Sequence, residues 1–266
     1  MTKNIQLSRL GQGMPIVLIH GWGVNAGIWQ PLAEQLANNF EVITIDLPGF
    51  GLNVDCVPRD YSLENIADLI ASAVTREIGK PALYLGWSLG GLVATQIALS
   101  APEKVLGLIN VASSPCFVQK DEWPGIRPEI LNNFYKLLSV DTRKTIDNFL
   151  KIQAMGSPQL RTDIKTVRDL VMKHDMPSVD TLSASLKLLE NVDLRGALED
   201  LNLPALSLYG RLDTLVPKGA IAEISKISPN THTHTFEHSS HAPFISELSQ
   251  FAVVVEQWVT GQISKA

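Results

Sequence analysis

Short apolar runs alternate with amphipathic segments along most of the chain, and this alternation constrains the fold more than any other feature. The runs are nearly continuous in Val, Ile and Leu, which is typical of parallel strands covered on both faces. The segments between them repeat apolar residues at about 3.6-residue spacing, which predicts helices. The predicted strands cover residues 16–20, 42–46, 82–86, 105–112, 206–210 and 233–236, and the predicted helices cover 28–37, 63–78, 89–99, 220–227 and 248–259. This order favours an α/β fold with a mostly parallel central sheet flanked by helices.

The alternation stops between Cys116 and Asp193, where no strand signal is found. Four helices are predicted there, over residues 128–138, 142–154, 159–173 and 179–189. We therefore expect residues 1–115 and 194–266 to form one core and residues 116–193 to form an inserted helical lid. Ligands of open α/β sheets bind where the carboxyl ends of the strands lie, so the lid is expected at that edge.

Composition supports one large core and disfavours several classes of function. The chain has 266 residues, 45% of them hydrophobic, and a net charge of −5, which disfavours general nucleic-acid binding. No apolar run approaches the length of a membrane helix, and the amino terminus lacks the apolar core of a signal peptide. Two cysteines do not make a disulfide framework. We expect a soluble, cytoplasmic protein that acts as a monomer and binds neither nucleic acid nor membrane.

Residues 86–90 read Gly-Trp-Ser-Leu-Gly and lie between a predicted strand and a predicted helix. In that context the pattern G-x-S-x-G predicts a nucleophile elbow, in which a sharp turn exposes the hydroxyl of Ser88. The two glycines are expected for steric reasons, since a Cβ atom at either position would collide with the neighbouring strand or helix. An ordinary glycine-rich turn is the alternative. A serine hydroxyl becomes an effective nucleophile only with a base and with donors for the oxyanion.

A histidine and an aspartate in later loops can supply the base and its orienting acid. His241 lies in the loop before the last helix, where Pro243 stiffens the chain, and it is preferred to His238 in the same loop. Asp213 follows the predicted strand 206–210, and a turn-forming aspartate is the alternative. The chain order Ser88, Asp213, His241 is the order expected of α/β-hydrolases.

The remaining histidines have other interpretations. His20 ends a predicted strand, and His174 lies in the predicted lid. His232 and His234 lie two residues apart on the last predicted strand, but no carboxylate or thiol completes a metal set with them. We therefore expect no metal and no organic cofactor.

Two backbone N–H groups are expected to bind the oxyanion, those of Leu89 and Trp22. Leu89 follows Ser88 directly, and Trp22 lies in the loop after the first predicted strand. A purely structural turn is the alternative for that loop. The side chains of Trp22, Trp87 and Phe149 are candidates for the walls of an acyl slot, although each is more often a core residue.

Taken together, the motifs resemble the α/β-hydrolase superfamily along nearly the whole chain. They lie at residues 20–23, 46–51, 86–91, 213–217 and 240–243. A narrower resemblance, to the carboxylesterases of biotin synthesis, is carried by residues 86–94, 111–117, 121–126 and 241–246. This resemblance implies hydrolysis of the methyl ester of a pimeloyl chain on acyl carrier protein, which gives methanol and pimeloyl-acyl-carrier protein.

A basic stretch in the predicted lid agrees with an acidic carrier protein as the partner. Residues 143–173 contain seven Lys or Arg residues, three Asp residues and no Glu. By the resemblance, Lys144, Arg161 and Lys165 hold carrier-contact positions, while Asn148 is uncharged where a basic residue is expected. A solvated basic face without a partner is the alternative.

Other functions fit the same residues. A general short-chain carboxylesterase or a carbon–carbon bond hydrolase would use the same three residues and would leave the basic stretch unexplained. A small-ligand receptor that kept the fold without turnover is a third hypothesis, and a complete triad argues against it.

Overall fold

A seven-stranded sheet forms the centre of the computed structural model, which describes residues 4–155, 160–172 and 175–263. The strands are β1 (Leu7–Leu10), β2 (Met14–Ile19), β3 (Phe40–Ile45), β4 (Ala82–Trp87), β5 (Val105–Val111), β6 (Ala205–Gly210) and β7 (His232–Phe236). Their order across the sheet is β1-β3-β2-β4-β5-β6-β7, and every pair is parallel except β1 with β3. The predicted α/β fold with a mostly parallel sheet is confirmed.

Each of the six predicted strands is present, with its ends within two residues of the prediction. The prediction missed β1, an antiparallel edge strand of four residues, three of them exposed. Its hydrogen bonds to β3 define it, and it has no apolar run that a sequence pattern could detect.

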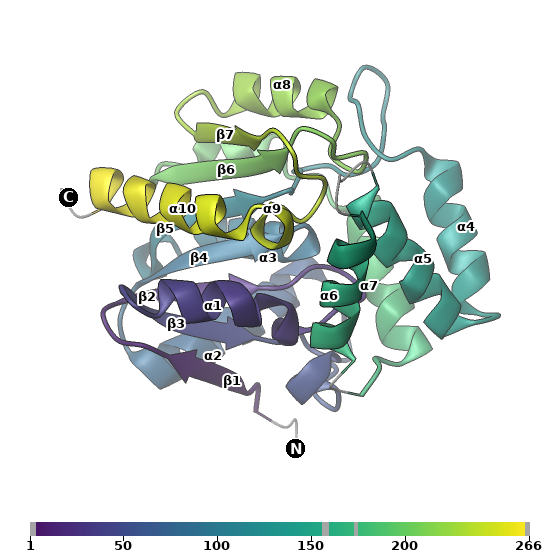
Figure 1. Cartoon of the computed structure of the whole chain (residues 1–266), viewed down its shortest axis with the longest axis horizontal. Coiled ribbons are helices and arrows are strands. Elements are labelled where there is room, and N and C mark those ends of the chain that lie inside the picture. Colours follow the sequence, from purple (N-terminus) through teal and green to yellow (C-terminus); the bar gives the residue numbers. More distant parts are fainter. Residues whose placement is uncertain (1–3, 156–159, 173–174, 264–266) are drawn as a thin grey trace.

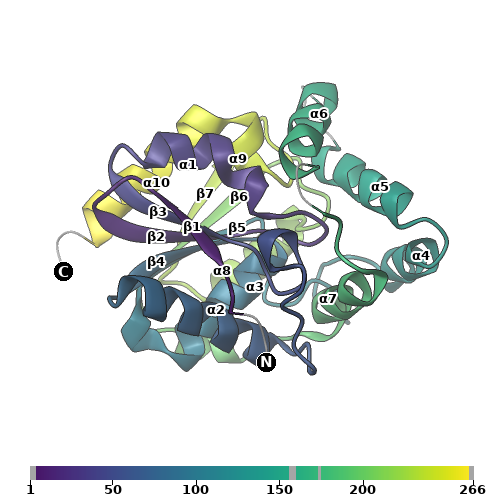
Figure 2. The same ribbon diagram turned by 90° about the horizontal axis from the view of Figure 1, so that it is seen from below.

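Helices cover both faces of the sheet (Figure 2). On one side lie α1 (Gln30–Leu36) and α10 (Leu248–Gln262), and on the other lie α2 (Leu63–Ile78) and α3 (Leu89–Ser100). The remaining core helices are α8 (Lys218–Ile227) and the short α9 (Pro243–Ser246), which the prediction missed because one turn shows no periodicity. The predicted helix 28–37 is instead a 3₁₀ turn, Ala26–Trp29, followed by α1, since the side chain of Asn25 caps that turn.

The described chain between β5 and β6 contains four helices and no strand of the sheet. They are α4 (Pro128–Leu138), α5 (Thr142–Ala154), α6 (Leu160–Val171) and α7 (Val179–Asn191), close to the predicted ranges. Figure 1 shows these helices together at one end of the sheet, and we call α4–α7 the helical insertion. Asp141 and Ser178 cap α5 and α7 through their side chains. Residues 156–159, Lys173 and His174, which include both ends of the helix predicted at 159–173, lie outside the described residues.

The core lies between the sheet and its helices. Its largest fully buried side chains include Trp22, Trp29, Trp87 and Phe244. None of the described helices is long and apolar enough to span a bilayer.

Candidate active site

Ser88 occupies the sharp turn between β4 and α3, with φ = 54° and ψ = −117°. A backbone conformation of this kind costs a non-glycine residue about 1–3 kcal/mol, so the surrounding structure must hold it. A Cβ atom at Gly86 would collide with the carbonyl of Gly90, and one at Gly90 would collide with the carbonyl of Ile19 on β2. The steric reason predicted for the two glycines is therefore found in the packing, and the turn is an elbow in shape.

Hydrogen bonds hold both backbone polar groups of Ser88. Its N–H donates to the carbonyl of Val111 at 2.9 Å. Its carbonyl accepts from the N–H of Gly91 and from the hydroxyl of Ser113, each at 2.9 Å. From the sequence, Ser113 was only one of residues 111–117, which carry the narrower family resemblance, and no role at the site was predicted for it. A hydroxyl residue just after a strand at the carboxyl edge is the signal that could have singled it out.

Asp213 and His241 form a buried pair. The Nδ1 atom of His241 lies 2.8 Å from Oδ2 of Asp213, and each side chain is only 1% exposed. The other carboxylate oxygen of Asp213 accepts from the N–H groups of Leu215 and Val216 at 2.8 and 3.1 Å. Asp213 thus organises its own turn and also orients the imidazole. His238, the other candidate base, is exposed, and only its backbone N–H contacts the carboxylate of Glu247.

The backbone of His241 is bound on two further sides. Its N–H donates to the carbonyl of Gln153 at the end of α5, at 3.0 Å. Its carbonyl accepts from the indole Nε1 of Trp87, the residue before Ser88, at 2.7 Å. The structure therefore brings His241 to Asp213, to the elbow and to the helical insertion. Within the described residues, Nε2 of His241 has no hydrogen-bond partner and does not join the hydroxyl of Ser88. Such bonds are often long until a substrate binds.

The loop after β2 lies directly against the elbow. A Cβ atom at Gly21 would be 3.2 Å from Cβ of Ser88. His20 is fully buried, and its ring accepts from the N–H of Leu47 through Nε2, 2.9 Å away, which leaves Nδ1 to donate to the Gly21 carbonyl at 2.8 Å. Burial lowers the pKa of His20, and the nearby carboxylate of Asp46 opposes this effect. His20 is accordingly a neutral support of this loop.

Asp46 has a structural role in the loops that follow β2 and β3. Its carboxylate accepts from the N–H groups of Ala26 and Leu52 at 2.6 and 2.9 Å. The two histidines that alternate on β7 also have ordinary structural surroundings. His232 is exposed, and the ring of His234 packs on Phe236. Over the ranges that the structure describes, no group of His, Cys, Asp or Glu could hold a metal ion.

Trp22 connects the loop after β2 to the helical insertion. Its indole N–H donates to the carbonyl of Leu182 on α7 at 3.0 Å, and its ring centroid lies 4.7 Å from that of Phe149 on α5. Trp87 has different neighbours, because its ring packs on Phe244 and lies near the ring of His241. The structure thus brings Trp22 and Phe149 together, and it places Trp87 under the loop that carries His241.

The three candidate carrier contacts are exposed on the helical insertion. Lys144 lies on α5, and Arg161 and Lys165 lie on α6. The two helices are joined by an ion pair between Arg168 and Asp147 at 2.8 Å. Asn148 accepts a long hydrogen bond of 3.5 Å from Lys151, so a positive charge lies next to the position where a basic residue was expected.

Comparisons with known proteins agree with this geometry. Residues 14–248 match the family model of the α/β hydrolase fold. The chain is 46% identical over 256 residues to a pimeloyl-[acyl-carrier protein] methyl ester esterase of Aeromonas salmonicida, covering 96% of this chain and 99% of that relative. It is 44% identical to the enzyme of the same name from Aeromonas hydrophila, with the same coverage.

A search of solved structures found the same fold. An esterase from Exiguobacterium antarcticum superposes with a TM-score of 0.87 at 22% identity, covering 96% of this chain and 95% of the other. At that identity the likeness concerns the fold alone. The family match and the two full-length relatives carry the assignment, and the chain belongs to the α/β-hydrolase family.

Proposed function

We propose that the protein is a serine carboxylesterase that hydrolyses the methyl ester of a pimeloyl chain on acyl carrier protein, in biotin synthesis. The observation that supports this chemistry is the buried Asp213–His241 pair. The carbonyl of His241 also accepts a hydrogen bond from Trp87, the residue before Ser88. The substrate is suggested by the names of the two relatives, which match this chain along nearly its whole length. Cys56 and Cys116 are both buried side chains, and the cytoplasmic location expected from the sequence is part of this proposal.

In this proposal, Ser88 attacks the ester carbonyl while Nε2 of His241 takes the hydroxyl proton. Asp213 stays ionised, keeps the imidazole in one tautomer and stabilises the imidazolium. The N–H groups of Leu89 and Trp22 bind the oxyanion, and loss of one such donor costs about 3 kcal/mol of transition-state stabilisation. His241 then gives its proton to the departing methoxide. A water molecule, activated by His241, hydrolyses the acyl-enzyme and releases the pimeloyl carboxylate.

The helical insertion acts as a lid in this proposal, within the boundaries 116–193 expected from the sequence. Trp22 and Phe149, in ring contact, form one wall of the slot for the acyl chain. Trp87, the third candidate for this wall, packs on Phe244 and His241 instead, and it supports the loop that carries His241. Lys144, Arg161 and Lys165 attract the acidic carrier, because opposite potentials steer the encounter between proteins.

The decisive experiment compares the carrier-linked methyl ester with free methyl pimelate over a range of salt concentrations. We expect a preference for the carrier-linked ester, measured as the ratio of kcat/KM values, and we expect salt to reduce that preference because it screens exposed charges. Equal use of the two esters at every salt concentration would point to a general short-chain carboxylesterase. Failure of Ser88 to react with a fluorophosphonate probe would remove the esterase proposal altogether.

A further inference from the structure

We propose that Ser113 is a positioning residue that sets the direction of the Leu89 N–H at the elbow. This inference rests on the proposed function, in which that N–H is one of two oxyanion donors. Ser113 does not touch the substrate in this scheme. It acts through a single peptide unit, the one that joins Ser88 to Leu89.

The peptide between Ser88 and Leu89 is planar and trans, so its carbonyl and its N–H point in opposite directions. A group that fixes the direction of the Ser88 carbonyl therefore also fixes the direction of the Leu89 N–H. Two donors hold that carbonyl, the N–H of Gly91 and the hydroxyl of Ser113, each at 2.9 Å. The Gly91 bond belongs to the first turn of α3, which any helix starting here would form. The Ser113 bond comes from the loop after β5 and is specific to this side chain.

The backbone after β5 places the Ser113 hydroxyl within hydrogen-bond distance of the Ser88 carbonyl. Val111, the last residue of β5, accepts from the N–H of Ser88, so residues 111–113 hold both backbone polar groups of the elbow. Between them, Ala112 has φ = 45°, a left-handed conformation that is unfavourable for alanine. That turn carries the chain from β5 to a position where Ser113 reaches the Ser88 carbonyl. A Cβ atom at Gly91 would collide with the side chain of Ser113, so this glycine leaves the space that Ser113 needs.

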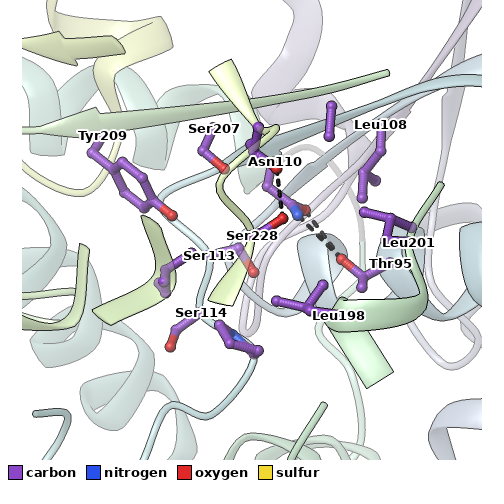
Figure 3. A pocket seen from close by; sticks show the side chains of 14 residues that line it. Thr95, Leu108, Asn110, Ser113, Ser114, Leu198, Leu201, Ser207, Tyr209 and Ser228 are labelled. Atoms are coloured by element: carbon purple, nitrogen blue, oxygen red, sulfur yellow. Dashed lines mark hydrogen bonds between the residues drawn. The ribbon is translucent and has the colours of Figure 1, made fainter. Parts of the chain in front are cut away.

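The hydroxyl of Ser113 has only one proton, which it donates in the hydrogen bond to the Ser88 carbonyl. Behind the elbow, Ser113 lines a cavity of about 20 Å³ together with Asn110, Ser207 and Tyr209 (Figure 3). Such a volume is roughly enough for one water molecule, and Ser113 can only accept a hydrogen bond from it. Ser207 lines the same cavity and is equally buried, with 5% of each residue exposed. No bond from Ser207 to Ser88 is seen in the described structure, so Ser207 offers a matched control.

The test compares Ser113→Val with Ser113→Thr, two side chains of nearly equal shape of which only threonine has a hydroxyl. For Ser113→Val we expect kcat to fall about three- to tenfold with little change in KM, which is the loss expected for one hydrogen bond. Ser113→Thr should restore most of the activity. Ser207→Ala should leave kcat within about twofold of the wild type, since it removes a hydroxyl that does not hold the elbow.

A second readout separates positioning from a merely structural role. A trifluoromethyl ketone analogue of the substrate adds to Ser88 and forms an oxyanion, whereas the product carboxylate does not. Ser113→Val should weaken binding of the ketone by the same factor as kcat/KM and should leave product binding unchanged. If Ser113→Val lowers the melting temperature but keeps the kcat and the ketone affinity of Ser207→Ala, the inference is wrong. In that case, normal hydrolysis by the wild type would leave the proposed function intact.

Discussion

The loops that carry the candidate triad and the helical insertion meet at the same edge of the sheet, but they present opposite physical environments. Asp213 and His241 are almost completely buried, and both are held by directed hydrogen bonds. Lys144, Arg161 and Lys165 are exposed on the insertion. Buried pairs are screened little by salt, whereas exposed charges are screened strongly. Under the proposed function, chemistry and carrier recognition can therefore be altered separately.

The largest effect is expected for Ser88→Ala. It should reduce hydrolysis of a p-nitrophenyl ester by a factor on the order of 10⁴ or more, because it removes the nucleophile. The melting temperature should stay close to that of the wild type, since alanine has the same Cβ atom in the same strained turn. Esterase assays and thermal unfolding together check this prediction. Full hydrolysis by the variant would contradict the assignment of Ser88.

A slightly smaller effect is expected for Asp213→Asn. The asparagine oxygen can still accept from Leu215 and Val216, but its amide then faces Nδ1 of His241 and favours the wrong tautomer. We expect kcat to fall about 10³- to 10⁴-fold for the carrier-linked and the free ester alike. Steady-state kinetics with both substrates would show this. A loss confined to the carrier-linked ester would contradict the separation of chemistry from recognition.

Charge reversal on the insertion should give the opposite pattern. Arg161→Glu or Lys165→Glu is expected to lower kcat/KM for the carrier-linked ester about three- to tenfold at low salt, with a smaller effect as salt rises. Hydrolysis of free methyl pimelate should not change. Lys187→Glu, an exposed site on α7, alters the net charge equally and is the control. If reversal at Arg161 and Lys165 has no more effect than at Lys187, these residues do not contact the carrier.

The last prediction concerns the stability of the buried core, not activity. The pKa of His20 is lowered in the folded protein by burial, so the unfolded chain binds a proton more readily. The contribution of His20 to stability is therefore fully present above the ordinary histidine pKa and is lost as the pH falls below it, by at most about 1.4 kcal/mol per pH unit below roughly pH 6.5. Urea unfolding between pH 5 and 8 should show that the free energy of unfolding falls more steeply with decreasing pH for the wild type than for His20→Gln. The amide oxygen of that variant can still accept from the N–H of Leu47. Equal slopes would mean that folding does not lower the pKa of His20.

The sequence predicted most of the fold, and for the candidate site it predicted positions better than contacts. Strands such as β4 and helices such as α2 were found because their apolar spacing is a local property. Ser88, Asp213 and His241 could be singled out as candidates because their residue types and loop positions carry a signal, and the structure places Asp213 beside His241. The bond from His241 to the Gln153 carbonyl was not found, since every residue has a carbonyl and only tertiary packing selects one. The same reason explains β1, which is defined by its partner strand.

The two backbone bonds of His241 have a consequence for protein engineering. Its N–H donates to a carbonyl of the insertion, and its carbonyl accepts from Trp87 in the core, so the histidine joins these two parts of the fold. A chimera that replaces α4–α7 with the corresponding helices of another hydrolase must present a carbonyl where Gln153 has one. Otherwise the buried N–H of His241 has no acceptor, at a cost of about 1–3 kcal/mol. We therefore expect such a chimera to be most stable when the last turn of α5, which carries the Gln153 carbonyl, is kept.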